Sequence, residues 1–537
     1  MVFSPQTGTH RNTRRSHVTS SLLAGLLLAL LARHAAAAAT SAASATANGA
    51  TAEQAAAPAA DAQDAAGSGN SQGSSTSGSD DLQALNRALQ RAEKQIRDLE
   101  KRLASDEALQ SAGPASANAN AASADALSGT FGESGFTWET ADHSAIFHFE
   151  TNLSMDYRTF LDSYTPATAD TFLVRKARPI FEGTFDDIFD FRFMPDFGQG
   201  KAIVQDAWID ARAETWLVLT AGKFKAPVGL ERLQLERYAR FIEASLTADL
   251  LPYRDLGFQA SGELDEGILT YQAGVFDGAP DGGSTDALAT PDTDSSGKFT
   301  YDARVFSHPF IQTDLSGLEK LGLGIAGTYV NATGTTTKTS TTSLLASDKT
   351  PGQQPMFSYR SDTATGFNNA TVAHGIERRW VPQANYYYRS FGLLGEYVKE
   401  DQQVQRDLTL KSTRDATLEN RAWEVQGYYF LTGEDEAYDT ARPNHPIGQG
   451  GFGAVELVAR VHSIHFDNDA FSDGALSFAN IATAASAAHA VGTGVNWYLT
   501  DIFRVQLDYE ITHFEGDALH GNRPEEEVLT TQFALIF

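Results

Sequence analysis

The chain has no cysteine among its 537 residues. This absence excludes disulfide bonds, thiolate metal sites, cysteine nucleophiles and a lipid anchor on an N-terminal cysteine. Basic residues are also scarce, with 41 Lys and Arg against 68 Asp and Glu and a formal net charge of -27. A chain this acidic lacks the basic surface that general nucleic-acid binding requires.

Long apolar runs are missing as well. Residues 143–537 contain no run of eighteen apolar residues, so this region offers no transmembrane helix. Short segments in which apolar and polar residues alternate take their place. This alternation is typical of strands, because successive side chains of a strand point to opposite faces. Near the C-terminus one face carries charges of both signs, whereas the other carries Phe503, Val505, Leu507, Tyr509 and Ile511. The polar face could meet bulk water in a soluble sheet or a water-filled lumen in an outer-membrane barrel.

Segments of this kind predict an even number of strands, sixteen, as a closed bacterial barrel needs. The expected strands are residues 143–160, 171–185, 188–196, 203–211, 215–224, 256–264, 268–277, 298–308, 320–331, 381–389, 391–400, 421–432, 451–465, 488–499, 501–512 and 528–537. We therefore predict an all-β fold, a 16-stranded antiparallel transmembrane β-barrel over residues 143–537. Sixteen strands leave an aqueous channel, which predicts passive diffusion of small hydrophilic solutes.

The connections between these strands alternate in length, which is typical of the outer loops and periplasmic turns of a barrel. Short turns are expected at sites such as Asp186-Asp187, and two expected turns, 309–319 and 433–450, are longer than the rest. Acidic pairs such as Asp435-Glu436 are interpreted as solvated turns. The expected outer loops are 225–255, 277–297, 332–380, 401–420, 466–487 and 513–527.

The first 142 residues have a different composition. Basic residues at Arg11, Arg14 and Arg15, an apolar stretch over 22–31 and small residues over 35–39 predict a secretory signal peptide over residues 1–39. Residues 40–80 and 105–142 are rich in Ala, Ser, Gly and Asn, which predicts linkers.

Residues 81–104 carry apolar residues at a 3-4 spacing, which predicts a short N-terminal coiled-coil helix. An isolated helix of this length is marginal in water, so we expect self-association. A helix docked on its own chain is the alternative. The residues of the apolar seam are Leu82, Leu85, Leu89, Ala92, Ile96, Leu99 and Leu103.

Basic residues gather in one part of this acidic chain. Residues 222–240 hold five of them against only Glu231 and Glu236, at the end of the fifth expected strand and in the loop after it. Arginine clusters favour oxyanions, and rings of Arg or Lys select anions in pores. The five basic residues are Lys223, Lys225, Arg232, Arg237 and Arg240. Alternation also places Lys176, Arg178, Arg192, Arg460 and Arg504 on lumen faces. Balanced rings of acidic and basic residues, with no net preference, are the alternative.

Several short motifs resemble the phosphate-selective porin O and P family. They are Val174-Arg175-Lys176-Ala177-Arg178-Pro179, Ala221-Gly222-Lys223-Phe224-Lys225-Ala226-Pro227, Leu251-Pro252-Tyr253-Arg254 and Gly494-Val495-Asn496-Trp497-Tyr498-Leu499. The resemblance spans residues 143–537 and implies a trimer with one pore per subunit and a third loop that folds into the pore. It also implies anion binding by Arg175 with Lys176 and by Arg232 with Arg237. By simple alternation Arg175 points outward unless its strand bulges.

The candidate anion-binding or pore-lining set is therefore Arg175, Lys176, Arg178, Arg192, Lys223, Lys225, Arg232, Arg237 and Arg240. We expect no metal and no cofactor. His462 and His465 lie three apart, which puts them on opposite faces of a strand. No spacing supports a catalytic group, so an enzyme is not expected.

Together these features predict a porin of the bacterial outer membrane, anion-preferring, with phosphate or polyphosphate as candidate solutes. The expected partners are outer-membrane lipid, two further copies in a homotrimer and small anions such as phosphate, but no nucleic acid. The alternative is a structural or adhesive barrel with a plugged pore, in which the coiled coil is the functional part.

Overall fold

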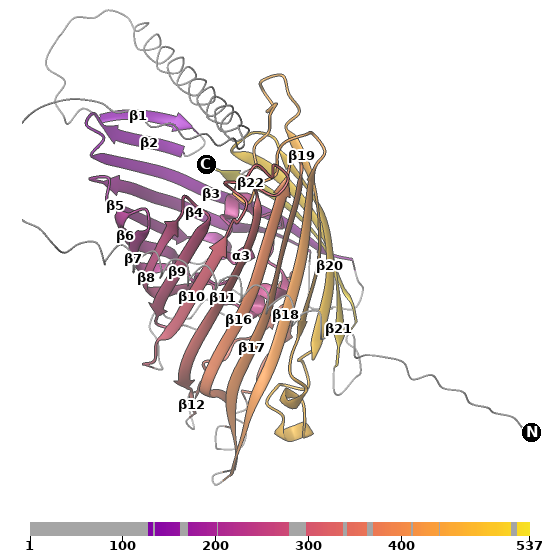
Figure 1. Ribbon diagram of the computed structural model, residues 1–537. Coiled ribbons are helices and arrows are strands. Elements are labelled where there is room, and N and C mark those ends of the chain that lie inside the picture. Colours follow the sequence, from indigo (N-terminus) through magenta and orange to yellow (C-terminus); the bar gives the residue numbers. More distant parts are fainter. Residues whose placement is uncertain are drawn as a thin grey trace, which may run out of the picture. The chain divides into compact units, whose positions relative to one another are not determined.

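Sixteen antiparallel strands form a closed barrel in which each strand pairs with the next along the chain and the last pairs with the first (Figure 1). This confirms the 16-stranded all-β fold. Within the described residues no helix is long and apolar enough to cross a membrane. The computed structural model describes residues 127–132, 135–161, 170–200, 202–278, 297–336, 341–361, 369–409, 412–439, 441–516 and 524–537. The predicted signal peptide, first linker and coiled coil lie outside these residues.

Each expected strand overlaps one strand of the barrel. These are β3 (Ala145–Phe160), β4 (Thr171–Phe185), β5 (Phe189–Asp196), β6 (Ile203–Glu214), β7 (Leu217–Lys225), β8 (Arg254–Leu264), β9 (Leu269–Phe276), β10 (Thr300–Ser307), β11 (Leu321–Thr333), β16 (Thr371–Tyr388), β17 (Phe391–Thr409), β18 (Ser412–Phe430), β19 (Ala454–His465), β20 (Ala487–Tyr498), β21 (Phe503–Glu515) and β22 (Glu526–Ile536).

Further short elements lie outside the barrel wall. They are the strands β1 (Leu127–Gly132), β2 (Gly135–Thr140), β12 (Thr335–Thr336), β13 (Thr341–Thr342), β14 (Asp348–Lys349) and β15 (Pro355–Phe357), the helix α3 (Leu230–Leu233) and the 3-10 turns η1 (Gly198–Gly200), η2 (Glu236–Tyr238), η3 (Leu246–Leu250), η4 (Asn468–Ala470) and η5 (Gly474–Leu476).

Alternation along each strand separates an apolar outer face from a polar lumen. On β21, Phe503 and Leu507 face outward and are exposed, whereas Gln506 and Glu510 face the lumen and are buried. Lipid solvates apolar side chains but not charges, so the charged face must line the interior of a membrane barrel. The short turn at Asp186-Asp187 also follows its prediction, since both residues have the positive φ of a two-residue hairpin.

The stretch expected to be the second linker contains a hairpin. β1 pairs with β2 in register, and β2 pairs with the start of β3, from Phe136 opposite Phe149 to Glu139 opposite Ile146. β22 pairs with the remainder of the same edge of β3. The sequence prediction missed this hairpin because its large apolar residues are few, although its pairing partners are adjacent in the chain.

The expected outer loop 401–420 was wrong. β17 extends to Thr409 and β18 begins at Ser412, and β16 likewise begins at Thr371 rather than at 381. These three strands lie side by side and are the longest of the barrel (Figure 1). The outer halves of β17 and β18 are mostly polar, and their apolar Val404 and Leu418 belong to a cluster inside the barrel. A lipid-facing apolar alternation therefore gave no signal there, although backbone pairing continues.

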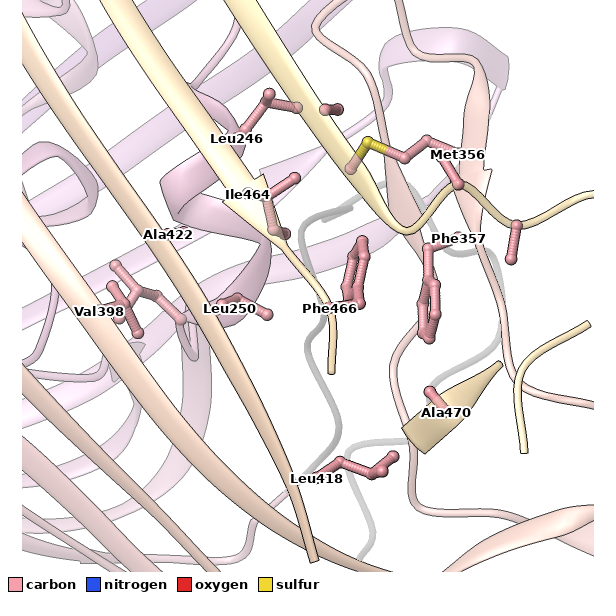
Figure 2. Close-up of a cluster of buried hydrophobic side chains, with 14 of the residues drawn as sticks. Leu246, Leu250, Met356, Phe357, Val398, Leu418, Ala422, Ile464, Phe466 and Ala470 are labelled. Atoms are coloured by element: carbon pink, nitrogen blue, oxygen red, sulfur yellow. The ribbon is translucent and has the colours of Figure 1, made fainter. Parts of the chain in front are cut away.

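The long connection between β7 and β8 (residues 226–253) folds into the barrel, as the family resemblance implied for the third loop. It carries α3, η2 and η3. We call it the lumen loop. At η3 its Leu246 and Leu250 join a hydrophobic cluster inside the barrel with side chains from β17, β18, β19 and the outer segments (Figure 2). The rings of Phe357 and Phe466 stack there with centroids 3.8 Å apart.

Candidate functional site

Polar groups of the barrel wall hold the lumen loop by its backbone. The amides of Leu230, Ile242 and Leu246 donate to Glu396 Oε2 at 2.7 Å, Asp508 Oδ2 at 2.7 Å and His462 Nδ1 at 2.9 Å. Loop backbone buried in a lumen needs such partners, because an unpaired amide would lose its hydration without compensation. The partners come from β17, β21 and β19, so the loop is tied across the barrel.

Arginines of the wall bind the loop carbonyls in the same way. Arg504 Nη1 donates to the carbonyl oxygens of Arg237 at 2.9 Å and Ala239 at 3.1 Å. Arg460 Nη1 donates to the carbonyl oxygen of Glu243 at 2.8 Å. Both arginines were predicted to face the lumen, and both do.

Glu243 of the lumen loop binds two arginines of the opposite wall. Arg175 holds its carboxylate with Nε at 2.7 Å and Nη2 at 2.9 Å, and Arg158 adds Nη2 at 2.9 Å. Burial alone would raise the pKa of Glu243, but the guanidinium of Arg175, followed by that of Arg158, outweighs burial and lowers the pKa to about 2. Glu243 therefore stays ionised and fixes the loop.

Glu236 makes the second link to the same wall. Its carboxylate pairs with Arg178 and with Lys176 Nζ at 3.0 Å, and it accepts from Tyr253 Oη at 3.1 Å. Burial opposes ionisation here too, yet Arg178 and Lys176 hold the pKa of Glu236 well below its usual value. Two loop carboxylates thus form ion pairs with three of the predicted anion-binding residues and with a further arginine.

A β-bulge places Arg175 in the lumen. Ser154 lies opposite Lys176, and the next residue, Met155, lies opposite Val174. Arg175 is the extra residue, so the alternation of β4 reverses at this point. Simple alternation had pointed this side chain toward lipid; instead it is buried against Glu243. The bulge lets two consecutive basic residues face the same loop.

Six of the nine predicted residues line one cavity beside the lumen loop. We call it the basic cavity. It has about 930 Å³ of empty space, part of it open to solvent, and seven basic against four acidic residues. The basic residues are Arg175, Lys176, Arg178, Lys225, Arg232, Arg240 and Lys349, and the acidic residues are Glu231, Glu236, Glu243 and Asp249.

Two cations of the basic cavity form no ion pair with the described residues. Arg232 donates Nη2 to the carbonyl oxygen of Ala248 at 2.7 Å and stacks over the ring of Tyr253, and its buried Nε has no acceptor. Lys225 Nζ donates to the carbonyl oxygen of Gln234 at 2.7 Å. Arg232, whose guanidinium stays protonated, therefore keeps unneutralised charge beside the cavity.

A second cavity, with about 1280 Å³ of empty space, lies next to it and contains Arg192 and Arg237. Here five acidic residues meet four basic ones. Arg237 pairs with Glu150 at 2.6 Å, and Arg192 pairs with Asp206 at 3.1 Å and with Glu182. Lys225 and Glu236 line both cavities.

Lys223 lines neither cavity. It shares its parity on β7 with the exposed Leu219, so its position is on the outer face rather than in the pore. The prediction that Lys223 lines the pore was therefore wrong. The cross-strand neighbour of Lys223 on β8 is Leu256, which is exposed on the outer face.

Arg240 is fully buried rather than free for solute. It pairs with Glu456 at 2.7 Å and with Glu436 at 3.0 Å. Glu436 belongs to the long turn between β18 and β19, whose acidic pair was interpreted as solvated. That interpretation holds for the exposed Asp435 but is wrong for Glu436, because the segment folds inward and Tyr438 Oη donates to the carbonyl oxygen of Leu230 at 2.6 Å. The one available signal was the unusual length of this turn.

A third cavity on the far side of η3 is acidic. It contains six acidic residues and one arginine, and Asp249 lines both it and the basic cavity. Burial raises the pKa of Asp249 to about 8, although the nearby Arg232 lowers it in part. The lining acids are Asp249, Asp255, Asp302, Asp348, Glu377 and Glu400, and the arginine is Arg379.

The two histidines do not form a metal pair. His462 is fully buried and contacts Glu510 and the amide of Leu246, and His465 lies at the outer end of β19. Within the described residues, a group of three carboxylates that could hold a metal ion occurs elsewhere, at Glu231, Glu396 and Glu424. The sequence did not reveal this group, because its members come from three separate elements.

A family model described as phosphate-selective porin O and P matches residues 147–537. Among solved structures, the chain is similar to the outer-membrane protein OmpT of Vibrio cholerae (11% identity, 73% of this chain and 98% of that chain, TM-score 0.42). It is also similar to OprB of Pseudomonas putida (10%, 73% and 94%, 0.44) and to the outer-membrane channel DcaP of Acinetobacter baumannii (8%, 74% and 99%, 0.45). No curated protein matches the chain.

The buried Arg240 provides a test of how the lumen loop is held. Replacing it in Arg240→Met leaves Glu436 and Glu456 without their shared cation, which we expect to lower the free energy of unfolding by about 3–5 kcal/mol. Urea unfolding of the refolded barrel, followed by tryptophan fluorescence, measures this loss. Arg378→Met is the control, since its pair with Asp401 is solvent-exposed and contributes at most about 1 kcal/mol. Equal losses in both variants would contradict the assignment.

Proposed function

The chain belongs to the phosphate-selective porin O and P family of the bacterial outer membrane, and from this premise we propose that its channel passes small hydrophilic solutes by passive diffusion with a preference for anions. The family and the fold are those of a channel. The observation that supports the anion preference is the basic cavity, where basic residues exceed acidic ones by three in a chain of net charge -27.

The surplus charge lies on Arg232 and Lys225. The carboxylates of Glu236 and Glu243 already neutralise the basic residues of β4, whereas Arg232 and Lys225 make only backbone hydrogen bonds and aromatic contacts. The guanidinium keeps an unused Nε–H. An anion entering the cavity can exchange hydration water for these donors.

Conduction also requires that the anion leaves. A site is useful in a pore when its binding is strong enough for entry and weak enough for exit. Lys225 lines both neighbouring cavities and can therefore contact a solute in either of them. On the far side, the paired Arg192 and Arg237 present smaller net charge. We propose phosphate and similar small oxyanions as the solutes, since a planar guanidinium offers them paired donors.

The proposal is tested by ion selectivity in planar bilayers under a salt gradient. We expect the double variant Arg232→Gln/Lys225→Gln to lower the anion-to-cation permeability ratio by about threefold or more, equivalent to roughly 0.7 kcal/mol. Lys399→Gln is the matched control, because Lys399 lies on the outer parity of β17 and pairs with Glu419. An unchanged ratio in the double variant would remove these residues from the mechanism. A wild-type protein that opens no channels would favour the plugged, structural barrel.

Asp249 makes the selectivity depend on pH. Its pKa of about 8 means that it is neutral below this pH and becomes a carboxylate above it, next to Arg232, Lys349, Glu231 and Asp348. The new negative charge then reduces the excess of positive charge in the basic cavity. We expect anion preference to fall between about pH 7 and 9. Reversal potentials across this range should fall more steeply in wild type than in Asp249→Asn; identical profiles would contradict the role.

We also propose that the barrel is a homotrimer. β5, β9 and β10 have eight residues each, which is less than the roughly nine to eleven that a membrane-spanning strand needs. The outer face of this low wall is aromatic and hollowed, with about 1580 Å³ of empty space lined by Phe258, Ile209 and their neighbours. A second copy would cover this face, where the strands are too short to span the apolar core of the membrane.

Size-exclusion chromatography with light scattering in detergent tests the trimer. Phe258 is 72% exposed, so Phe258→Glu should leave the fold intact but introduce charge at the proposed interface and yield monomers. Val425→Glu is the control on the long wall, where the side chain is 51% exposed and lipid is the expected neighbour. Trimers of wild-type stability in Phe258→Glu would place the interface elsewhere.

A further inference from the structure

Three carboxylates meet where the lumen loop contacts the barrel wall. Glu231 belongs to α3 of the loop, Glu396 to β17 and Glu424 to β18. Each offers an oxygen, and these oxygens lie within 4.8 Å of one another. The carboxyl groups of Glu396 and Glu424 are also within hydrogen-bonding reach of each other. Two carboxylates this close need a proton or a cation between them.

Protein groups around the cluster do not supply enough positive charge. Glu396 accepts from the amide of Leu230, and Glu231 accepts from the amide of Ser245 at 3.0 Å. These donors are neutral. Within the described residues, neither Glu396 nor Glu424 forms an ion pair. The one cation in reach of Glu231 is Arg460 Nη1, at 3.7 Å from Glu231 Oε1, and its guanidinium is held closer by Glu510, at 2.9 Å.

One oxygen of the cluster has no partner. Glu424 is 1% exposed, and its Oε1 accepts no hydrogen bond, whereas its Oε2 accepts from Gln426 Nε2 at 2.5 Å. A buried carboxylate oxygen without a donor is costly. Either a bound cation or a proton shared with Glu396 would satisfy this oxygen.

We propose that Glu231, Glu396 and Glu424 bind one divalent hard cation, Ca²⁺ or Mg²⁺, that joins the lumen loop to the barrel wall. Both ions prefer oxygen ligands, and two oxygens on opposite sides of a Ca²⁺ are about 5 Å apart, which matches this cluster. The ion brings the charge of the three carboxylates from -3 to -1.

Other groups complete the coordination. The amide of Gln426 contacts Glu231 at 2.8 Å as well as Glu424, so a rotation of this amide turns its carbonyl oxygen toward the ion. Gln426 and Glu231 also line the basic cavity, which gives the ion and its water ligands an entry path. The site therefore borders the anion route and acts on the position of the loop that narrows it.

Terbium luminescence tests this site with a probe for oxygen-rich calcium sites. The Oη of Tyr428 donates to Gln426 Oε1 at 2.8 Å, so this tyrosine is close enough to sensitise a bound Tb³⁺. We expect chelator-treated protein in detergent to bind one Tb³⁺ per chain, with Ca²⁺ or Mg²⁺ as competitor. Glu424→Gln should lose this signal, and Glu231→Gln should lower the affinity at least about tenfold. Glu182→Gln, which removes a lumen carboxylate already paired with Arg192, should bind as wild type.

Thermal denaturation distinguishes the ion from a shared proton. With the ion, millimolar Ca²⁺ raises the melting temperature of wild type but not of Glu424→Gln. With a proton alone, neither protein responds to Ca²⁺, and the proposal fails. Absence of saturable Tb³⁺ binding to wild type would also overturn it, whether or not the variants insert. Failure of the anion selectivity tests would leave this result unaffected.

Discussion

The charge contacts between the lumen loop and β4 are the interactions on which the rest of this structure depends. A loop of 28 residues lies inside a polar lumen, where its backbone and its side chains lose water. Glu236 and Glu243 compensate for this loss by binding Lys176, Arg178 and Arg175. Because each partner is buried, the pairs fix the loop only as a complete set, and removal of one member leaves an unpaired charge.

This arrangement also determines which basic residues remain for solute. Arginines and lysines on a lumen face are equivalent in sequence, yet the structure divides them into those that hold the loop and those that keep their charge. Arg175 and Arg178 belong to the first group, and Arg232 and Lys225 to the second. A motif therefore does not by itself identify an anion site, because its cations can be neutralised by carboxylates far along the chain.

The same principle explains the acidic regions. Glu231, Glu396 and Glu424 converge without adequate positive charge, and the acidic cavity beyond η3 repeats this imbalance on a larger scale. A chain with net charge -27 must place many carboxylates somewhere, and the lumen is the one polar interior it has. The lumen thus alternates between basic and acidic compartments, with Asp249 at a boundary between two of them.

The sequence by itself determined the barrel. Apolar side chains must face lipid and polar ones the lumen, so a period of two predicted all sixteen strands and the parity of Arg178, Arg460 and Arg504. Only the tertiary structure decided the rest: the bulge that turns Arg175 inward, the burial of Glu436 and the strand pairing of the outer halves of β17 and β18. These depend on backbone pairing and on charge partners hundreds of residues apart. The two-residue alternation of a strand predicts whether a side chain faces lipid or the lumen, but it does not predict which side chain it contacts there.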